Sequence, residues 1–380
     1  MEFSNDIPVE EALKLRKRNR LFWKNVFSPV GYRKLKDQID ELKVQVEGAE
    51  PENRIEEIVL EDMRNFSRAS EDLADYASGR GDIPTPEAVD SIYGERTFDR
   101  LKNDLENYDW DSAYRSQELE IERKTVDPRR FRERLEKELQ KVSSTIEEYA
   151  RSEGLVPEGL EMNIVPIPSS RKQRAFYNSE QKEVNIGLDY FRVVKNDGGL
   201  QIEATEAIYA LFHEFVGHAA HHHNSLKLEY PEFTSRPAEN FSASAHAEAV
   251  GIMANRNAER FIEKKMNELN VTERGFEIKK TKLDVKGNAG KILNAYYREM
   301  EARGEIESAE EKLSQLANQK WARNAVENWN DSYKYALKET TYTAGENLLE
   351  KIDVEDYQAL TTGLWTPETL PKYLDYREEK

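Results

Sequence analysis

All six histidines of this 380-residue chain lie in one stretch, between His213 and His246. Five of them fall within the run HEFVGHAAHHH, which begins at His213. Apolar side chains recur at helical spacing over 201–223, so we expect this run to form a helix. Histidines scattered by chance would not cluster in this way. The stretch is therefore the part of the sequence that most constrains the fold.

His213 and His218 are five positions apart, and Glu214 directly follows the first of them. In the usual zinc-peptidase helix, H-E-x-x-H, the two histidines are four residues apart and project from one face, with the glutamate beside them to activate a water. Five residues of an ideal α-helix turn the second side chain by about 140°. Both imidazoles reach one metal ion only if a π-bulge absorbs a residue, and we expect Gly217 to ease that distortion. We expect His222 and His223 to be ordinary helix-surface residues.

The sequence contains no cysteine, which excludes disulfides, thiolate ligands and cysteine nucleophiles. A zinc ion here must be held by histidine and carboxylate, and we expect one zinc per chain. The third ligand is expected from a second helix over 237–269. Glu248 is favoured because it lies in the small, apolar context AHAEAVGIMA, and Glu239 and His246 are the alternatives.

The formal net charge is −17, and charged residues make up 34% of the chain. An acidic surface argues against nucleic acid and against anionic membranes as partners, because both reward clustered lysine and arginine. Neither a signal-peptide-like start nor an apolar run approaching 18 residues is present, so we expect a cytoplasmic protein. Aromatic residues reach 10%, which indicates a globular chain with a core.

The rest of the sequence predicts a mainly α fold with one small β-sheet, at about 160–190, just before the histidine-rich helix. Within that sheet, strands flank a polar turn at 178–182. Strand 183–188 is either an ordinary hairpin strand or an edge that pairs with an extended substrate. We expect an N-terminal helical region over 1–125 and a metal-binding region over 126–380.

Further helices are predicted from apolar spacing and from start signals. A helix over 8–25 is basic, and we expect it to pack Leu13, Leu21, Phe22 and Trp23 inward. Asp127 followed by Pro128 predicts an N-cap and first helical residue for a helix that ends near 152. Two more helices are predicted over 33–48 and 53–79, and another begins after Pro86. From 237 to the C-terminus, further helices are predicted.

The run His213, Glu214, Gly217 and His218 resembles the H-E-x-x-G-H signature of the dipeptidyl peptidase III family of zinc exopeptidases. A later helix of that family reads E-E-C-R-A-E-S-V-G, and this chain matches its tail with Ala247-Glu248-x-Val250-Gly251. The family's ligand glutamate corresponds to Ser244 here, so either Glu248 or Glu239 takes over as ligand or the site is incomplete, and Glu248 is favoured. Together these matches cover about forty residues.

The same helix is similar to that of the thimet oligopeptidase relatives, H-E-F-G-H-x-x-H, if Val216 is removed. A C-terminal tyrosine followed three residues later by glycine, Tyr342 and Gly345 here, is a further likeness. All these families are gluzincins. The resemblance implies a helical, cleft-forming metallopeptidase with one zinc and a peptide substrate. Glu214 would be its general base, and Tyr342, or else His246, would be the donor to the developing oxyanion.

Three other interpretations compete with a peptidase. Glu214, His218 and His222 are successively four apart, so on a regular helix they would line one face and, with Glu248 and His246, form a di-iron bundle. The serine at 244 is compatible with a catalytically silent descendant that binds metal or a partner. The histidines are also compatible with an ordinary amphipathic helix.

Overall fold

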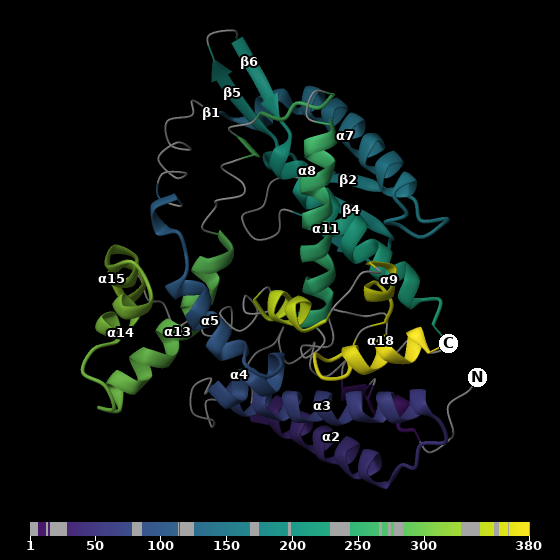
Figure 1. The fold of residues 1–380 in the computed structure, drawn as a ribbon, viewed down its shortest axis with the longest axis vertical. Helices are drawn as coiled ribbons and strands as arrows, with labels where there is room; N and C mark the ends of the chain where they lie inside the picture. The colour runs from purple at the N-terminus through teal and green to yellow at the C-terminus, as the bar shows by residue number, and fades with distance from the viewer. Residues whose placement is uncertain are drawn as a thin grey trace.

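The computed structural model describes most of the chain and is mainly helical, with two small three-stranded sheets (Figure 1). This confirms the predicted fold class. None of the described helices is long and apolar enough to cross a membrane. The described residues are 7–12, 14–15, 29–77, 86–112, 114, 125–167, 175–196, 199–228, 244–265, 268–272, 275–276, 284–327, 343–352, 357–363 and 365–379.

The N-terminal helices follow the predicted apolar spacing. Helix α2 spans Pro29–Gly48 and α3 spans Arg54–Ala77, and the two pack against each other at the base of the molecule (Figure 1). Helix α4 spans Pro86–Tyr93 and so begins at Pro86 itself, one residue before the predicted start, and α5 covers Thr97–Glu106. Most of the basic helix expected over 8–25 lies outside the described residues, as do Leu13, Leu21, Phe22 and Trp23.

The start of the next helix differs from the prediction. Residues Pro128–Phe131 form a 3₁₀ turn, η1, and α7 runs from Arg132 to Ser152. The predicted end is confirmed, but the predicted cap is wrong, because α7 is preceded by Phe131 and has no side-chain cap. The backbone N–H of Arg130 instead bonds the carbonyl of Asp127 at 3.2 Å, an i to i+3 bond that produces the tighter turn.

The predicted small sheet is confirmed. Its strands are β2 (Ile164–Ile167), β3 (Ala175–Asn178) and β4 (Glu183–Gly187), in the order β2-β4-β3. Strand β4 is paired on both sides, parallel to β2 and antiparallel to β3. Both edges of β4 are therefore occupied. Of the two alternatives for strand 183–188, the hairpin strand is confirmed and the strand that pairs with a substrate is wrong.

A second sheet was not predicted. It contains β1 (Thr125–Val126), β5 (Arg192–Asn196) and β6 (Gly199–Glu203), in the order β1-β5-β6. The histidine-rich helix therefore begins later than position 201, with α8 at Thr205. Val193 and Ile202 pair across the sheet and are both buried. This pairing overrides the helical spacing that the sequence shows locally.

Helix α11, which spans Ser244–Lys265, stands at the centre of the molecule (Figure 1). It supplies buried side chains to all three hydrophobic cores. One core surrounds the β2-β4-β3 sheet, α7 and the histidine-rich helix. In the other two cores, the N-terminal helices α2, α3, α4 and α5 pack against helices from the C-terminal half. These include α13 (Asp284–Ala302). The regions 1–125 and 126–380 therefore share two of their cores.

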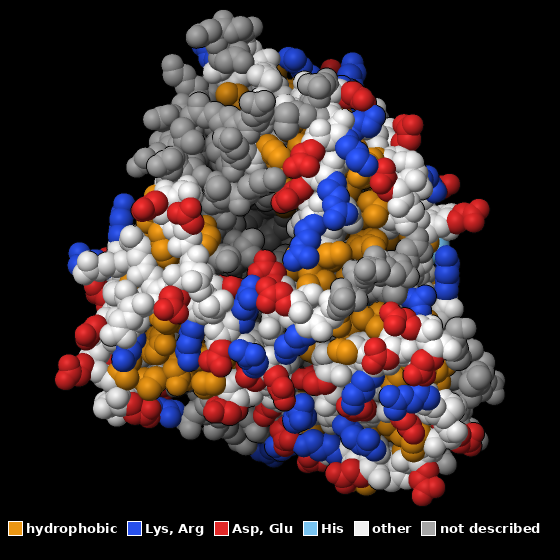
Figure 2. Space-filling view, viewed as in Figure 1, with side chains coloured by type: hydrophobic (Ala, Val, Ile, Leu, Met, Phe, Trp, Pro, Cys, Tyr) orange, Lys and Arg blue, Asp and Glu red, His pale blue; other side chains and the backbone are white. Residues whose placement is uncertain are grey.

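The remaining C-terminal helices lie around these cores. They are α14 (Ala309–Leu316), α15 (Gln319–Glu327), a helical segment at 343–351, α17 (Tyr357–Leu360) and α18 (Leu370–Glu378). Acidic and basic side chains are interspersed over the face of the molecule in Figure 2. The large net negative charge is therefore not gathered into one acidic patch on this face.

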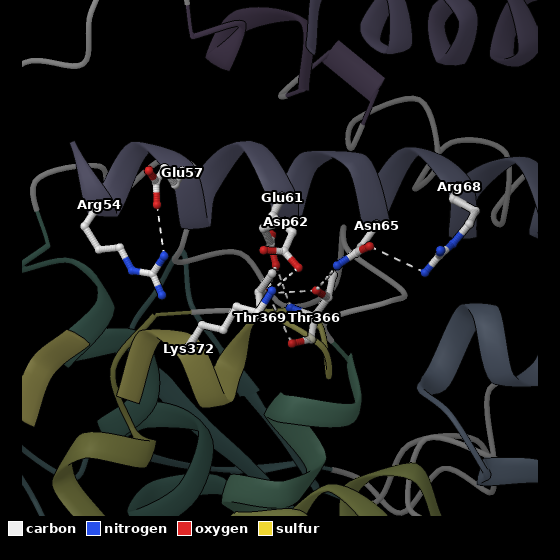
Figure 3. Close-up of polar contacts among 9 residues, drawn as sticks. All are labelled: Arg54, Glu57, Glu61, Asp62, Asn65, Arg68, Thr366, Thr369 and Lys372. Atoms are coloured by element: carbon white, nitrogen blue, oxygen red, sulfur yellow. Dashed lines mark hydrogen bonds and ion pairs between the residues drawn. The ribbon is translucent and has the colours of Figure 1, made fainter. Parts of the chain in front are cut away.

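The C-terminus is tied to α3 by a buried carboxylate (Figure 3). The side chain of Asp62 is fully buried and accepts a hydrogen bond from the backbone N–H of Thr366 at 2.7 Å and another from the Thr369 hydroxyl. Glu61, next along the helix, pairs with Lys372 of α18. A buried carboxylate is stable only when such donors replace water, so this contact fixes the C-terminal segment on α3.

Replacing Asp62 by alanine is expected to lower the free energy of unfolding by about 1–3 kcal/mol, because the buried Thr366 N–H loses its acceptor. Urea denaturation measures the change. Glu57→Ala on the same helix is the control, since Glu57 is exposed and pairs only with neighbouring Arg54 in the contacts of Figure 3. Equal effects of the two substitutions would contradict this account of the tie.

Candidate metal centre

The helix that carries the histidines switches from α-helical to π-helical hydrogen bonding between His213 and His218, where a bulge was predicted. Between α8 (Thr205–Leu211) and α9 (Ala220–Ser225), residues Phe212–Ala219 form a π-helix, η3. The backbone N–H of Ala220 is directed to the carbonyl of Phe215, five residues earlier. The predicted bulge is therefore confirmed, and the Nε2 atoms of His213 and His218 lie 3.1 Å apart.

Glu248 approaches this pair from α11. Its Oε2 lies 3.5 Å from Nε2 of His213, and one ligand atom from each of the three side chains lies within 4.8 Å of the others. Within the described part of the chain, this is the one group of three or more such side chains placed to hold a metal.

The separations suit zinc. With bonds of about 2.0–2.1 Å to a tetrahedral ion, ligand atoms stand roughly 3.3 Å apart, between the 3.1 and 3.5 Å found here. Two imidazoles and one carboxylate are also the donor set of catalytic zinc sites, which keep a fourth position open. The side chains present therefore fit the expected ion.

Two glycines allow α11 to approach the π-helical turn. A Cβ on Gly251 would lie 2.3 Å from Cε1 of His213, a distance that no side chain tolerates. A Cβ on Gly217 would lie 3.1 Å from the Cα of Gly251. Gly217 was expected to ease the bulge, and the structure shows in addition that it permits close packing of the two helices. The missing side chain of Gly251 makes room for the imidazole.

Further contacts orient His213 from α11. Its Nδ1 lies 3.5 Å from Nδ2 of Asn255, and the backbone of Gly251 also hydrogen-bonds the ring. A metal-binding histidine commonly donates its other ring N–H to an acceptor, which fixes the orientation of the ring. The Gly251 backbone contact fits this role, whereas the Asn255 amide nitrogen is itself a donor and serves as a packing neighbour of the ring. No sequence pattern identifies Asn255, because only the packing of α11 on the π-helix places it beside His213.

Burial and neighbouring charges act differently on the two imidazoles. Burial lowers the pKa of His213, but the carboxylates of Glu248 and Glu214 raise it, and the net direction is upward. The pKa of His218 falls to about 3, first because the ring is buried and then because His213 is adjacent. His218 is therefore neutral at ordinary pH, the form that offers a lone pair to a metal.

The small sheet positions Glu214. The backbone N–H of Tyr177, on β3, donates to Oε2 of Glu214 at 2.7 Å. Burial raises the pKa of this carboxyl, while His213 and the Tyr177 N–H lower it, and the net direction is upward. A buried carboxylate with a raised pKa beside candidate metal ligands is the environment expected of a general base.

His246 lies apart from the three metal-ligand atoms. Its Nε2 is 2.8 Å from the carbonyl oxygen of Leu360, and its Nδ1 accepts from the backbone N–H of Trp365 at 3.2 Å. The ring is fully buried, and burial lowers its pKa to about 3. Both nitrogens of His246 thus hold the C-terminal segment in place.

The histidines that follow the pair also lie inside the protein. Nε2 of His221 bonds the carbonyl of Gly363, and its ring lies 5.0 Å from that of His246. Nδ1 of His222 is 3.3 Å from the hydroxyl of Tyr177. The expectation of a surface position is wrong for His222, which is buried, while His223 is half-buried. Contact with the C-terminal segment and with β3 covers this face of the helix.

Two other expected residues, Tyr342 and Glu239, lie outside the described residues. Gly345, the partner of Tyr342 in the sequence pattern, lies against α11. A Cβ there would be 2.8 Å from the backbone nitrogen of Ala249 and 3.1 Å from the carbonyl carbon of Glu248. The segment 343–351 therefore begins beside the part of α11 that carries the candidate ligand.

Comparison with known proteins adds no relative. No protein-family model matches the chain, and neither a curated protein nor a solved structure matches it.

Gly251→Ala is expected to displace the His213 imidazole and to lower zinc affinity without unfolding the protein, because one methyl group fills the space of the ring. Zinc affinity is measured by competition with a chromophoric chelator. Gly48→Ala, where nothing lies within 4 Å of an added Cβ, is the control. Unchanged affinity in Gly251→Ala would show that the ring does not bind metal in this position.

Acid is expected to destabilise the fold through His221. Burial lowers its pKa from 6.5 to about 4, so the unfolded chain binds more protons below pH 6.5 than the folded chain does. The free energy of unfolding therefore falls as the pH drops from about 6.5 towards 4, by about 2 kcal/mol at pH 5 for this residue. His221→Gln should reduce the difference between urea denaturation at pH 7 and pH 5. The same pH dependence in both proteins would contradict this.

Proposed function

We propose that the protein is a zinc-dependent peptidase that binds one zinc ion through His213, His218 and Glu248. The observation that carries the proposal is the π-helical turn. It brings the Nε2 atoms of two histidines, which are five positions apart in sequence, to within 3.1 Å of each other, and Glu214 lies between them in sequence. A regular α-helix would direct the two rings apart. The choice of a peptide as substrate rests on the resemblance to gluzincins.

Zinc bound by these side chains would supply the Lewis acidity that makes water nucleophilic near neutral pH. Glu214 then accepts the proton of the attacking water and delivers it to the leaving amine. The Tyr177 N–H fixes Oε2 of this carboxylate, so Oε1 is the oxygen that takes up the proton. The raised pKa brings the proton affinity of Glu214 closer to the pH at which it works.

The substrate would lie along β3. Alternate residues of a strand direct their backbone groups to the same edge, so Ala175 shares the edge at which Tyr177 meets Glu214. This edge faces away from β4, and an extended peptide pairing here would pass beside the general base. Strand β3 thus takes the role that the sequence suggested for 183–188.

The developing oxyanion needs a hydrogen-bond donor. Tyr342 remains our proposed donor, supported by the position of Gly345 against the backbone of Glu248 and Ala249. His246 is less suited, because both of its nitrogens already contact backbone groups of the C-terminal segment.

Metal analysis of the purified protein distinguishes this proposal from a di-iron bundle. We expect one zinc per chain, since the group found among the described residues contains a single carboxylate, whereas carboxylate-bridged di-iron sites use several. About two irons per chain would contradict the proposal. Zinc binding without cleavage of any member of a broad peptide library would instead favour a catalytically silent metal-binding protein.

Glu214→Gln is expected to retain zinc and to lose peptide hydrolysis by at least about 100-fold, because the amide accepts no proton. Cleavage of a fluorogenic peptide library and zinc content are measured on the same sample. His213→Ala is the matched control and should lose both zinc and activity. Hydrolysis that survives in Glu214→Gln would show that another group acts as the base.

A further inference from the structure

The change of helical register deprives one backbone carbonyl of its usual partner. In a regular α-helix the N–H of Ala220 would bond the carbonyl of Val216, four residues earlier. Here that N–H is directed to Phe215, and α9 resumes the ordinary register at Ala220. The carbonyl of Val216 is therefore passed over, and its side chain is fully buried. A buried carbonyl without a donor would cost free energy and favour the regular helix.

Tyr357 of α17 supplies a donor from a distant part of the sequence. Its hydroxyl donates to the Val216 carbonyl oxygen at 2.7 Å. Burial raises the pKa of this phenol, so it keeps its proton. The ring packs against the core around the β2-β4-β3 sheet and against the core that joins α2 and α3 to the C-terminus.

The segment that carries Tyr357 is held to the same helix by other contacts. Nδ2 of Asn224 donates to the Thr361 hydroxyl at 2.9 Å, and the N–H of Gly363 donates to Oγ of Ser225 at 3.0 Å. The contacts of Asn224 and Ser225, which follow the π-helical turn in sequence, thus position the phenol against that turn. This arrangement favours the π-helical register, because there the phenol replaces the N–H donor that the Val216 carbonyl has lost, whereas in an α-helix that carbonyl already has a donor.

We propose that Tyr357 is a positioning residue of the zinc site. Its hydrogen bond to Val216 stabilises the π-helical register and so keeps His213 and His218 on one face. The phenol donates to a backbone carbonyl, so its effect on the site passes through the backbone of the turn. The link to zinc rests on the proposed function, whereas the effect on the turn does not.

Tyr357→Phe tests the proposal, with Tyr209→Phe as the matched control. Tyr209 is also buried, and its hydroxyl bonds Glu259 at 3.3 Å between α8 and α11, away from the Val216 carbonyl. We expect Tyr357→Phe to lower zinc affinity by about 10- to 100-fold, the range found when outer contacts of metal sites are removed. The visible spectrum of the cobalt-substituted protein should change in Tyr357→Phe alone. Equal zinc affinities in the two variants would overturn the proposal.

Hydrogen exchange of the metal-free proteins separates the two proposals. We expect faster amide exchange over 212–221 in Tyr357→Phe than in Tyr209→Phe, because the α-helical and π-helical registers then interconvert more readily. If the wild type binds no zinc, the proposed function fails, and this exchange difference still decides whether Tyr357 holds the turn. The same exchange in both variants would overturn that role.

Discussion

The structure of the candidate site depends on one departure from regular helical hydrogen bonding. The extra residue between His213 and His218 is absorbed by the π-helical turn Phe212–Ala219. Because an isolated turn of this kind is less stable than an α-helix, the rest of the fold must favour it. Close packing of α11 at Gly251 and the donor from Tyr357 both act on this turn.

Helix α11 links the site to the whole molecule. It carries Glu248 and contributes to each of the three cores, so its position is fixed from the sheet, from α2 and α3, and from α5 and α13. The C-terminal segment contacts His221 and His246, which lie on the two helices that carry the candidate ligands, and is then anchored to α3 by Asp62. The C-terminal segment thus links α3 to the two helices on which the three candidate ligands lie. This explains why two of the six histidines serve packing.

The sequence alone determined the features that depend on local spacing. Apolar residues three and four apart predicted α2, α3 and the mainly helical fold, and the polar turn at 178–182 predicted the pairing of β3 with β4. The five-residue interval between His213 and His218 predicted a bulge, because helical geometry offers no other way to bring the rings together. Helical geometry does not identify the third side chain. The small, apolar setting of Glu248 and the resemblance to gluzincins favour it, and its Oε2 lies 3.5 Å from Nε2 of His213.

Only the tertiary structure decided what depends on distant contacts. The sheet formed by β1, β5 and β6 joins Thr125 to residues almost seventy positions later, and such pairing leaves no local pattern. Burial of His222 and the backbone contacts of His246 arise from β3 and from the C-terminal segment, which the sequence of the helix does not contain. Tyr357 is one of 18 tyrosines, and nothing near it in sequence distinguishes it. Its importance comes from the fold, which places its hydroxyl against the one carbonyl that the π-helical turn passes over.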